Sequence, residues 1–100
     1  MPTSSYKIRV PHEVADLIRG MHPNLKKKVR ASLNIILSSL DKGKVLKAEL
    51  AGLRSFRVSN IRIIYRISKN QVEVVALGPR QRIYEETFLI LKREGNKGGT

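Results

Sequence analysis

The sequence predicts an α+β fold, in which a mainly antiparallel four-stranded sheet carries an N-terminal helical hairpin on one face and ends in a C-terminal helix. Two features indicate this fold. Residues 53–84 contain three runs of alternating apolar and polar residues, separated by two short turns. Before this stretch, one short alternating segment and two helical patterns follow each other closely.

The N-terminal part predicts one strand and two helices. Tyr6–Val10 alternates with its apolar residues on one face. Pro11 suits the first turn of a helix that Gly20 ends, and Pro23 opens a second helix. The second helix has a continuous apolar stripe of Leu25, Val29, Leu33, Ile36, Leu37 and Leu40. Because the link is short, we expect an antiparallel hairpin whose stripe covers the core face of the sheet.

Two turns, Ser59-Asn60 and Lys69-Asn70, set the pairing of the three later strands. The first turn pairs Val58 with Ile61, Arg57 with Arg62 and Phe56 with Ile63. On the expected core face, the second turn pairs Ile67 with Val72, Tyr65 with Val74 and Ile63 with Ala76. On the opposite face, it pairs Arg66 with Glu73 and Ile64 with Val75. The first of these faces is therefore expected to be buried.

The last element is predicted as a helix from Tyr84 to about Glu94. Phe88 and Leu91 lie on its apolar stripe, and Glu85 and Glu86 lie in its first turn. With 100 residues the chain is long enough for one modest core. We expect one domain over residues 1–95 and a disordered tail over residues 96–100.

The chain is strongly basic, with a net charge of +12 and 41% hydrophobic residues. From Lys42 to Arg82 there are ten lysines and arginines against Glu49 and Glu73, so this segment supplies +8 of the total. Such a balance indicates a polyanionic partner, which is a nucleic acid, an anionic membrane surface or an acidic protein. Charge alone does not choose among these partners.

Several classes of function lose support from the composition. The chain contains no cysteine, which excludes disulfide scaffolds and thiolate metal sites and is compatible with a reducing cytosol. His12 and His22 have no partner at metal-ligand or triad spacing, so no metal or other cofactor is expected. No apolar run approaches the roughly 20 residues that span a bilayer, and no signal peptide is visible. We expect a soluble, cytoplasmic protein without a membrane partner.

The sheet face opposite the core carries facing like charges. Arg57 lies across from Arg62, an arrangement that destabilises a sheet by roughly a few tenths of a kcal/mol or more. Either an anion belongs between the two guanidinium groups or both splay into water. The segment after the third strand brings Arg80, Arg82 and Tyr84 to the same end of the sheet. Tyr84 offers a ring on which a base could stack, or it is a core residue at a helix start.

The order and spacing of these residues resemble the RelE/ParE superfamily of toxin–antitoxin toxins. The residues that carry the resemblance are Leu53, Phe56-Arg57-Val58, Arg62-Ile63-Ile64-Tyr65, Arg80 and Tyr84. The resemblance covers almost the whole chain, because those toxins consist of a strand, a helical hairpin, a sheet meander and a C-terminal helix. It implies a RelE-like fold and an mRNA interferase, which is a metal-independent endoribonuclease that cleaves mRNA on the ribosome and inhibits translation. It also implies a RelB-like antitoxin with an acidic segment, bound in a toxin–antitoxin hetero-oligomer.

The resemblance also assigns roles to individual residues. Positions that serve cleavage in RelE-like toxins are matched by Arg57, Arg62, Arg80 and Tyr84. Accessory RNA-binding charges are expected at Arg54, Arg82, Lys42, Lys44 and Lys47. Arginine suits phosphodiester cleavage by a neighbouring 2′-OH because its rigid fork of donors stabilises charge on the non-bridging oxygens. It is a poor base, so proton transfer is the weak part of this interpretation.

One position departs from the RelE pattern. Many RelE-like sheets carry a second basic residue two positions before the one matched by Arg57, and this chain has Ser55 there. Either Arg54 or a lysine of the segment Lys42–Lys47 substitutes, or activity is weakened or lost. ParE-like toxins share the fold but act on DNA gyrase without this RNA-cleaving set. A ParE-like gyrase inhibitor and a non-catalytic basic RNA-binding module are therefore the alternatives.

Overall fold

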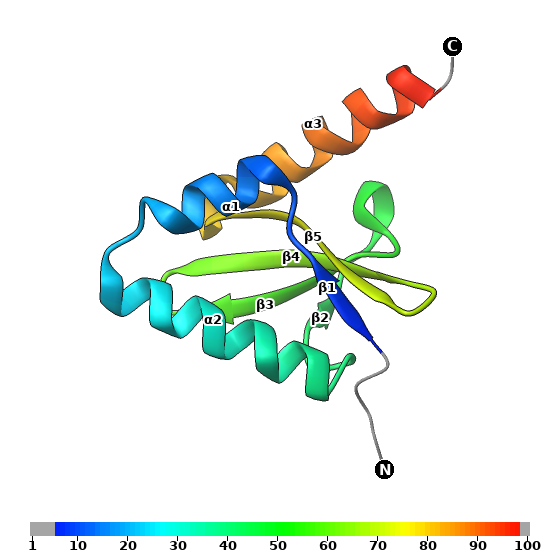
Figure 1. Ribbon diagram of the computed structural model, residues 1–100. Helices are drawn as coiled ribbons and strands as arrows, with labels where there is room; N and C mark the ends of the chain where they lie inside the picture. Colours follow the sequence, from blue (N-terminus) through cyan, green and yellow to red (C-terminus); the bar gives the residue numbers. More distant parts are fainter. Residues whose placement is uncertain (1–5, 99–100) are drawn as a thin grey trace.

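A computed structural model describes residues 6–98 of the chain. The elements, in order, are β1 (Lys7–Arg9), α1 (His12–Arg19), α2 (Pro23–Ser38), β2 (Lys44–Val45), the short 3-10 helix η1 (Ala48–Leu50), β3 (Arg54–Val58), β4 (Ile61–Ser68), β5 (Gln71–Pro79) and α3 (Arg80–Gly98) (Figure 1). They form one mixed sheet in the order β1-β5-β4-β3-β2.

The predicted α+β class is confirmed, but the sheet has five strands rather than four. β1 runs parallel to β5, whereas the other neighbouring strands are antiparallel. The additional strand β2 pairs with β3 over two residues only, Lys44 with Ser55 and Val45 with Arg54. Two residues are too few to show an alternating pattern, so sequence periodicity cannot detect this strand.

The predicted strand register is correct up to an irregularity in β5. Arg57 faces Arg62 around the first turn, and Tyr65 faces Val74 around the second. Beyond that pair the register shifts by one residue, so that Ile64 faces Ala76 and Ile63 faces Leu77. The predicted pairs Ile64 with Val75 and Ile63 with Ala76 are therefore wrong. A β-bulge inserts one extra residue, and the uniformly apolar run Val75-Ala76-Leu77 gives no alternation that would reveal it.

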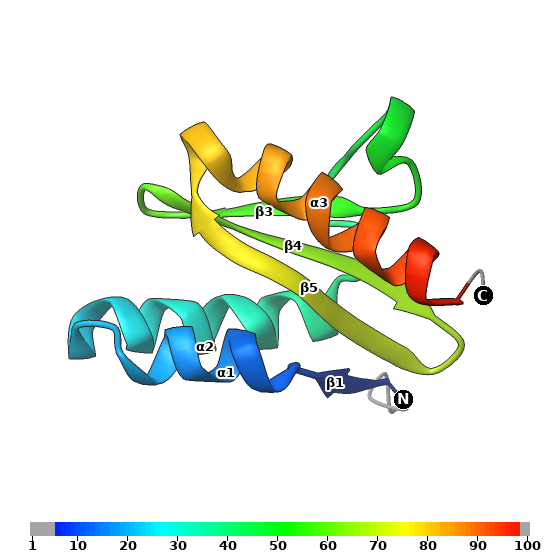
Figure 2. The ribbon, with the colours of Figure 1, turned by 90° about the horizontal axis from the view of Figure 1, so that it is seen from above.

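Both faces of the sheet are covered, one by α1 and α2 and the other by α3 (Figure 2). The larger apolar cluster packs Val29 and Ile36 of α2 against Ile63, Tyr65 and other residues of the sheet. This arrangement confirms that the helical hairpin covers the predicted core face. The second cluster packs Ile83 of α3 against Leu53, Ile64, Val75 and Ala76. The bulge thus sends two consecutive residues of β5 towards α3.

Helix α3 begins at Arg80, four residues before the predicted start. Glu85 and Glu86 therefore lie beyond its first turn, and the buried stripe contains Ile83 and Thr87. Phe88, which was predicted on the buried stripe, is 39% exposed. The helix runs to Gly98, into the segment predicted as a disordered tail, and residues 99–100 of that tail lie outside the described residues. Gly78-Pro79 is a typical turn signal, so the sequence does not show that β5 passes directly into α3.

A buried tyrosine fixes the link between α2 and β2. The Tyr65 hydroxyl donates to the Leu40 carbonyl oxygen at 2.9 Å and accepts from the Gly43 backbone nitrogen at 3.0 Å. A Cβ at Gly43 would lie 2.6 Å from that hydroxyl, so only glycine fits this close approach. Burial of the hydroxyl raises the pKa of Tyr65 above its ordinary value. These contacts determine where the chain enters β2 beside β3.

Within residues 6–98, no helix is both long enough and apolar enough to cross a membrane. The same described residues contain no group of three or more histidine or acidic side chains placed to hold a metal ion.

Candidate active site

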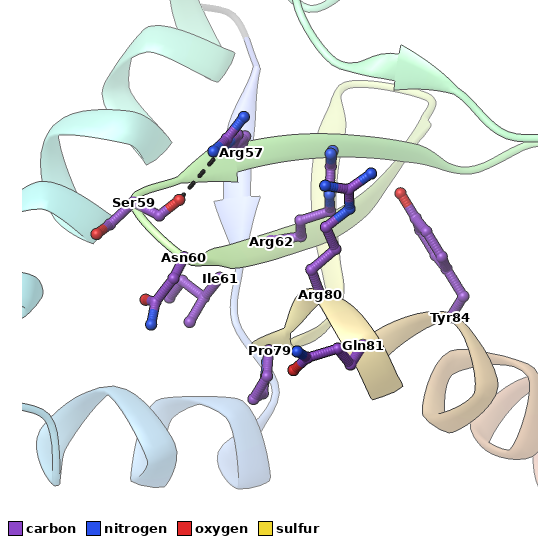
Figure 3. A pocket seen from close by; sticks show the side chains of 9 residues that line it. All are labelled: Arg57, Ser59, Asn60, Ile61, Arg62, Pro79, Arg80, Gln81 and Tyr84. Atoms are coloured by element: carbon purple, nitrogen blue, oxygen red, sulfur yellow. Dashed lines mark hydrogen bonds between the residues drawn. The ribbon is translucent and has the colours of Figure 1, made fainter.

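A pocket of about 590 Å³ lies where the β3–β4 turn meets the start of α3 (Figure 3). Its lining residues are Arg57, Ser59, Asn60, Ile61, Arg62, Pro79, Arg80, Gln81 and Tyr84. All four residues that the sequence predicted as catalytic are therefore brought to one cavity, called here the arginine pocket. Arg57 comes from β3 and Arg62 from β4, whereas Arg80 and Tyr84 lie about one turn apart on α3.

Each element places its residue for a local reason. The Ser59-Asn60 turn, with Ser59 at a φ of 56°, pairs Arg57 with Arg62 on the face of the sheet that α3 covers. Ile83 anchors the first turns of α3 on the second apolar cluster. Helical spacing then carries Arg80 and Tyr84 towards β3 and β4, as Figure 3 shows for both side chains.

The charge of the arginine pocket is not compensated. None of its lining residues is acidic, and Arg57, Arg62 and Arg80 take part in none of the ion pairs found among residues 6–98. Arg66 provides the contrast on the same strand as Arg62. Its Nε lies 2.9 Å from a Glu73 oxygen and its Nη2 lies 3.5 Å from Glu94, and the hydrogen bond to Glu73 raises its pKa.

The guanidinium group of Arg62 is only partly satisfied by contacts within the described part of the chain. Its Nη1 donates to the Ser55 hydroxyl at 3.2 Å, but its Nε is buried without any hydrogen-bond partner. A buried donor left unpaired costs roughly 1–3 kcal/mol, and bound water or a bound ion commonly satisfies such a group in native proteins. An anion in the arginine pocket would supply acceptors for a half-buried guanidinium group.

Ser55 connects the two sides of the pocket. It is 2% exposed, and its hydroxyl lies 3.3 Å from the Tyr84 hydroxyl as well as 3.2 Å from Arg62. Arg57 is exposed, and its Nε donates to the Ser59 carbonyl oxygen at 3.3 Å, which Figure 3 marks with a dashed line. Sequence reasoning missed Ser55 as a contact, although the alternation of β3 places it on the same face as Arg57.

The predicted accessory charges do not form one group. Arg54 lies on the opposite face of β3, where its Nη1 donates to the Gly43 carbonyl oxygen at 3.2 Å, so it does not replace a basic residue at Ser55. Arg82 is exposed and lies about 200° around α3 from Arg80, away from the pocket. Of the three lysines, Lys44 directly faces Ser55 from β2, whereas Lys42 and Lys47 are exposed outside the lining.

A second, smaller pocket of about 320 Å³ lies between η1 and α3. It is lined by Glu49, Leu50, Tyr84, Glu85 and Phe88. Tyr84 lines both pockets and therefore separates them. Sequence patterns do not predict this cavity, because the segment that contributes Glu49 has neither a helical nor an alternating pattern.

Solved structures with the same fold include three toxins. The toxin–antitoxin complex RelBE2 from Mycobacterium tuberculosis is 24% identical, with a TM-score of 0.66, and the match covers 75% of this chain and 98% of that one. A mutant of E. coli RelE in the free state is 16% identical, with a TM-score of 0.72 and coverage of 88% and 96%. The RelE–RelB complex from Pyrococcus horikoshii is 20% identical, with a TM-score of 0.65 and coverage of 78% and 98%.

The sequence itself assigns the family. A comparison with curated proteins gives no match. The family model described as the ParE toxin of the type II toxin–antitoxin system parDE matches residues 12–84, which is well over half of the chain and includes α1 through the start of α3. Together with the RelE-like fold, this match shows that the chain belongs to the RelE/ParE superfamily of type II toxins, within the ParE toxin family.

Proposed function

We propose that this toxin is an endoribonuclease that cleaves mRNA, with the arginine pocket as its active site. The observation that carries the proposal is that Arg57, Arg62 and Arg80 line one pocket whose lining contains no acidic residue. A phosphodiester offers the charge and the acceptor geometry that this set lacks.

The chemistry is an attack of the ribose 2′-OH on the adjacent phosphorus. The new bond to the 2′-oxygen forms as the bond to the 5′-oxygen of the next nucleotide breaks, which leaves a cyclic phosphate and a 5′-OH end. Negative charge gathers on the non-bridging oxygens, which Arg57, Arg62 and Arg80 approach from β3, β4 and α3. The 2′-OH proton and the leaving oxygen need an acceptor and a donor, respectively.

Tyr84 is the nearest candidate for this proton transfer and for stacking on a base. Its hydroxyl is held by Ser55 at 3.3 Å, so the position of the ring is fixed. No side chain that lines the arginine pocket is a strong base at neutral pH. We therefore expect cleavage to depend on the ribosome, which would align the 2′-OH with the phosphate and so replace part of the missing base catalysis.

The same pocket provides an inhibitory surface for an antitoxin. The three arginines without ion-pair partners would bind carboxylates of an acidic antitoxin segment as they bind phosphate. Two of the solved relatives are complexes of a toxin with its antitoxin. An antitoxin bound in this way competes directly with RNA, and the affinity of the toxin for the antitoxin falls as the salt concentration rises.

Inhibition of DNA gyrase is the second candidate function, and the match to the ParE family model favours it. Under this alternative the arginine pocket would bind a protein surface or DNA instead of the scissile phosphate of an mRNA. The two functions differ in what the cell accumulates, because one cuts mRNA and the other produces gyrase-linked DNA breaks.

The deciding experiment is to induce the protein in cells, map new mRNA 5′ ends and assay DNA breaks in the same cultures. We expect new cuts within translated mRNA, lost in Arg62→Ala and retained in Arg30→Ala, which removes the same charge from the exposed side of α2. DNA breaks without new mRNA ends would refute the ribonuclease and support the gyrase inhibitor.

A further inference from the structure

We infer that the second pocket, on the other side of Tyr84, binds a nucleobase beside the scissile phosphate and prefers guanine. This inference rests on the proposed function, because it names the substrate feature that the same site would select. Tyr84 lines both cavities, so a nucleotide whose phosphate lies in the arginine pocket can place a neighbouring base in the second pocket.

The walls of this base pocket suit an aromatic ring. Phe88 follows Tyr84 by four residues on α3, so the two aromatic side chains lie on the same face of the helix. Phe88 is 39% exposed although it is a large apolar residue, and Leu50 of η1 lies opposite. Stacking on an aromatic side chain favours binding of a base by roughly 5- to 150-fold. The exposed ring of Phe88 is thus accounted for by a ligand that covers it.

The wall that comes from η1 is held in place. The Leu46 nitrogen donates to the Leu53 carbonyl oxygen at 3.0 Å, and the Leu53 nitrogen donates to the Leu50 carbonyl oxygen at 3.2 Å. These backbone hydrogen bonds close residues 46–53 into a compact loop. Leu46 and Leu50 also pack on the second apolar cluster, which includes Ile83 of α3. The carboxylate of Glu49 is therefore presented by an anchored segment.

Two carboxylates in this pocket point to recognition of a base edge. Glu49 and Glu85 sit beside a site for phosphate, which they would repel, and neither takes part in an ion pair among the described residues. Glu85 lies beyond the first turn of α3, where the helix dipole stabilises it little. A carboxylate can only accept hydrogen bonds, so it selects a base that presents N–H donors.

Guanine fits this requirement best. Its Watson–Crick edge presents two adjacent donors, N1–H and the 2-amino group, which a single carboxylate can accept side by side. Adenine and cytosine present one amino group each, and the single N–H of uracil lies between two carbonyl oxygens. A good bidentate contact discriminates between bases by about 5- to 150-fold. Glu49 and Glu85 come from different elements and can approach the same ring from two sides.

The test compares the cleavage rates of two ribosome-bound mRNAs that differ only in the 2-amino group of one base. One carries guanosine at the preferred cleavage site and the other carries inosine, which lacks the 2-amino group. For the wild type we expect the single-turnover rate to fall about tenfold from guanosine to inosine. In Glu85→Gln, Glu49→Gln and the double variant, this ratio should approach one. In Phe88→Ala both rates should fall while the ratio stays.

Two variants control for charge and for lost apolar surface. Glu86→Gln makes the same change at the next residue, whose side chain lines the groove between α1 and α3 instead. Leu89→Ala removes an apolar side chain that is 51% exposed outside the pocket. Both should keep the wild-type ratio. If all glutamate variants keep the wild-type ratio, the base pocket is refuted while the ribonuclease stands. If the wild type cuts neither message, the ribonuclease itself is refuted.

Discussion

Replacing Arg62 with methionine should abolish cleavage and stabilise the protein. The change keeps most of the half-buried aliphatic stem but removes the charge that faces Arg57 and the buried Nε that has no partner. Relief of the unpaired donor is worth roughly 1–3 kcal/mol, and loss of the facing like charge adds a few tenths. The lost hydrogen bond to Ser55 costs about 1–2 kcal/mol in return. Taken at mid-range, these contributions leave a net gain of about 1 kcal/mol, which raises Tm by roughly 4–8 °C in a domain of this size.

Arg66→Met is the matched control for this prediction. The same change is made four residues later on the same strand, but Arg66 has acidic partners in Glu73 and Glu94. Its removal leaves Glu73, whose side chain is 14% exposed, with Arg9 alone, so Tm should fall. Calorimetry gives both Tm values, and mapping of mRNA 5′ ends gives activity. A fall in Tm for Arg62→Met equal to that of Arg66→Met would refute the view of the arginine pocket as an unsatisfied anion site.

Four further predictions test individual contacts. If the Tyr84 hydroxyl takes part in proton transfer, Tyr84→Phe should lower the single-turnover rate by about 10² or more; if the ring mainly stacks on a base, Phe should keep the rate and Ala should lose it. Tyr65→Phe should cost about 1–3 kcal/mol of unfolding free energy at neutral pH, because two backbone hydrogen bonds are lost. Since the Tyr65 pKa is raised in the fold, its contribution is present below about pH 10 and is lost as pH rises further, so this variant should also show a smaller alkaline loss in denaturant titrations. Lys44→Ala should slow cleavage about tenfold without changing Tm, whereas Lys42→Ala should leave the cleavage rate unchanged. If both variants slow cleavage equally, the two lysines have only a general electrostatic role. Hydrogen exchange over residues 84–94 and the basic sheet face should slow when an acidic antitoxin binds, and unchanged protection in both would exclude this mode of inhibition.

Sequence periodicity predicts most of the strands and helices and their pairing, because both turns of the meander are short and are flanked by alternating residues. The pairing of Arg57 with Arg62 follows from one turn alone, and it placed half of the arginine pocket. Three features gave no such signal. The bulge at Val75 lies in an unbroken apolar run, β2 is two residues long, and the start of α3 directly follows a proline that ends β5. The second pocket depends on η1, whose segment has no periodic pattern either, so the sequence does not predict this pocket.

Ser55 bears on the choice between a ribonuclease and a gyrase inhibitor, because many RelE-like sheets carry a basic residue at this position. A basic side chain at this position would lie next to the guanidinium group of Arg62, and the two like charges would repel each other. The serine instead accepts a hydrogen bond from Arg62 and contacts the Tyr84 hydroxyl, which holds both groups towards the arginine pocket. The register of β2 places the exposed Lys44 directly beside it, so a positive charge remains on this face of the sheet without burial. Lys44 on the neighbouring strand thus offers a positive charge on the face where Ser55 lacks one, and its removal tests whether that charge contributes to cleavage.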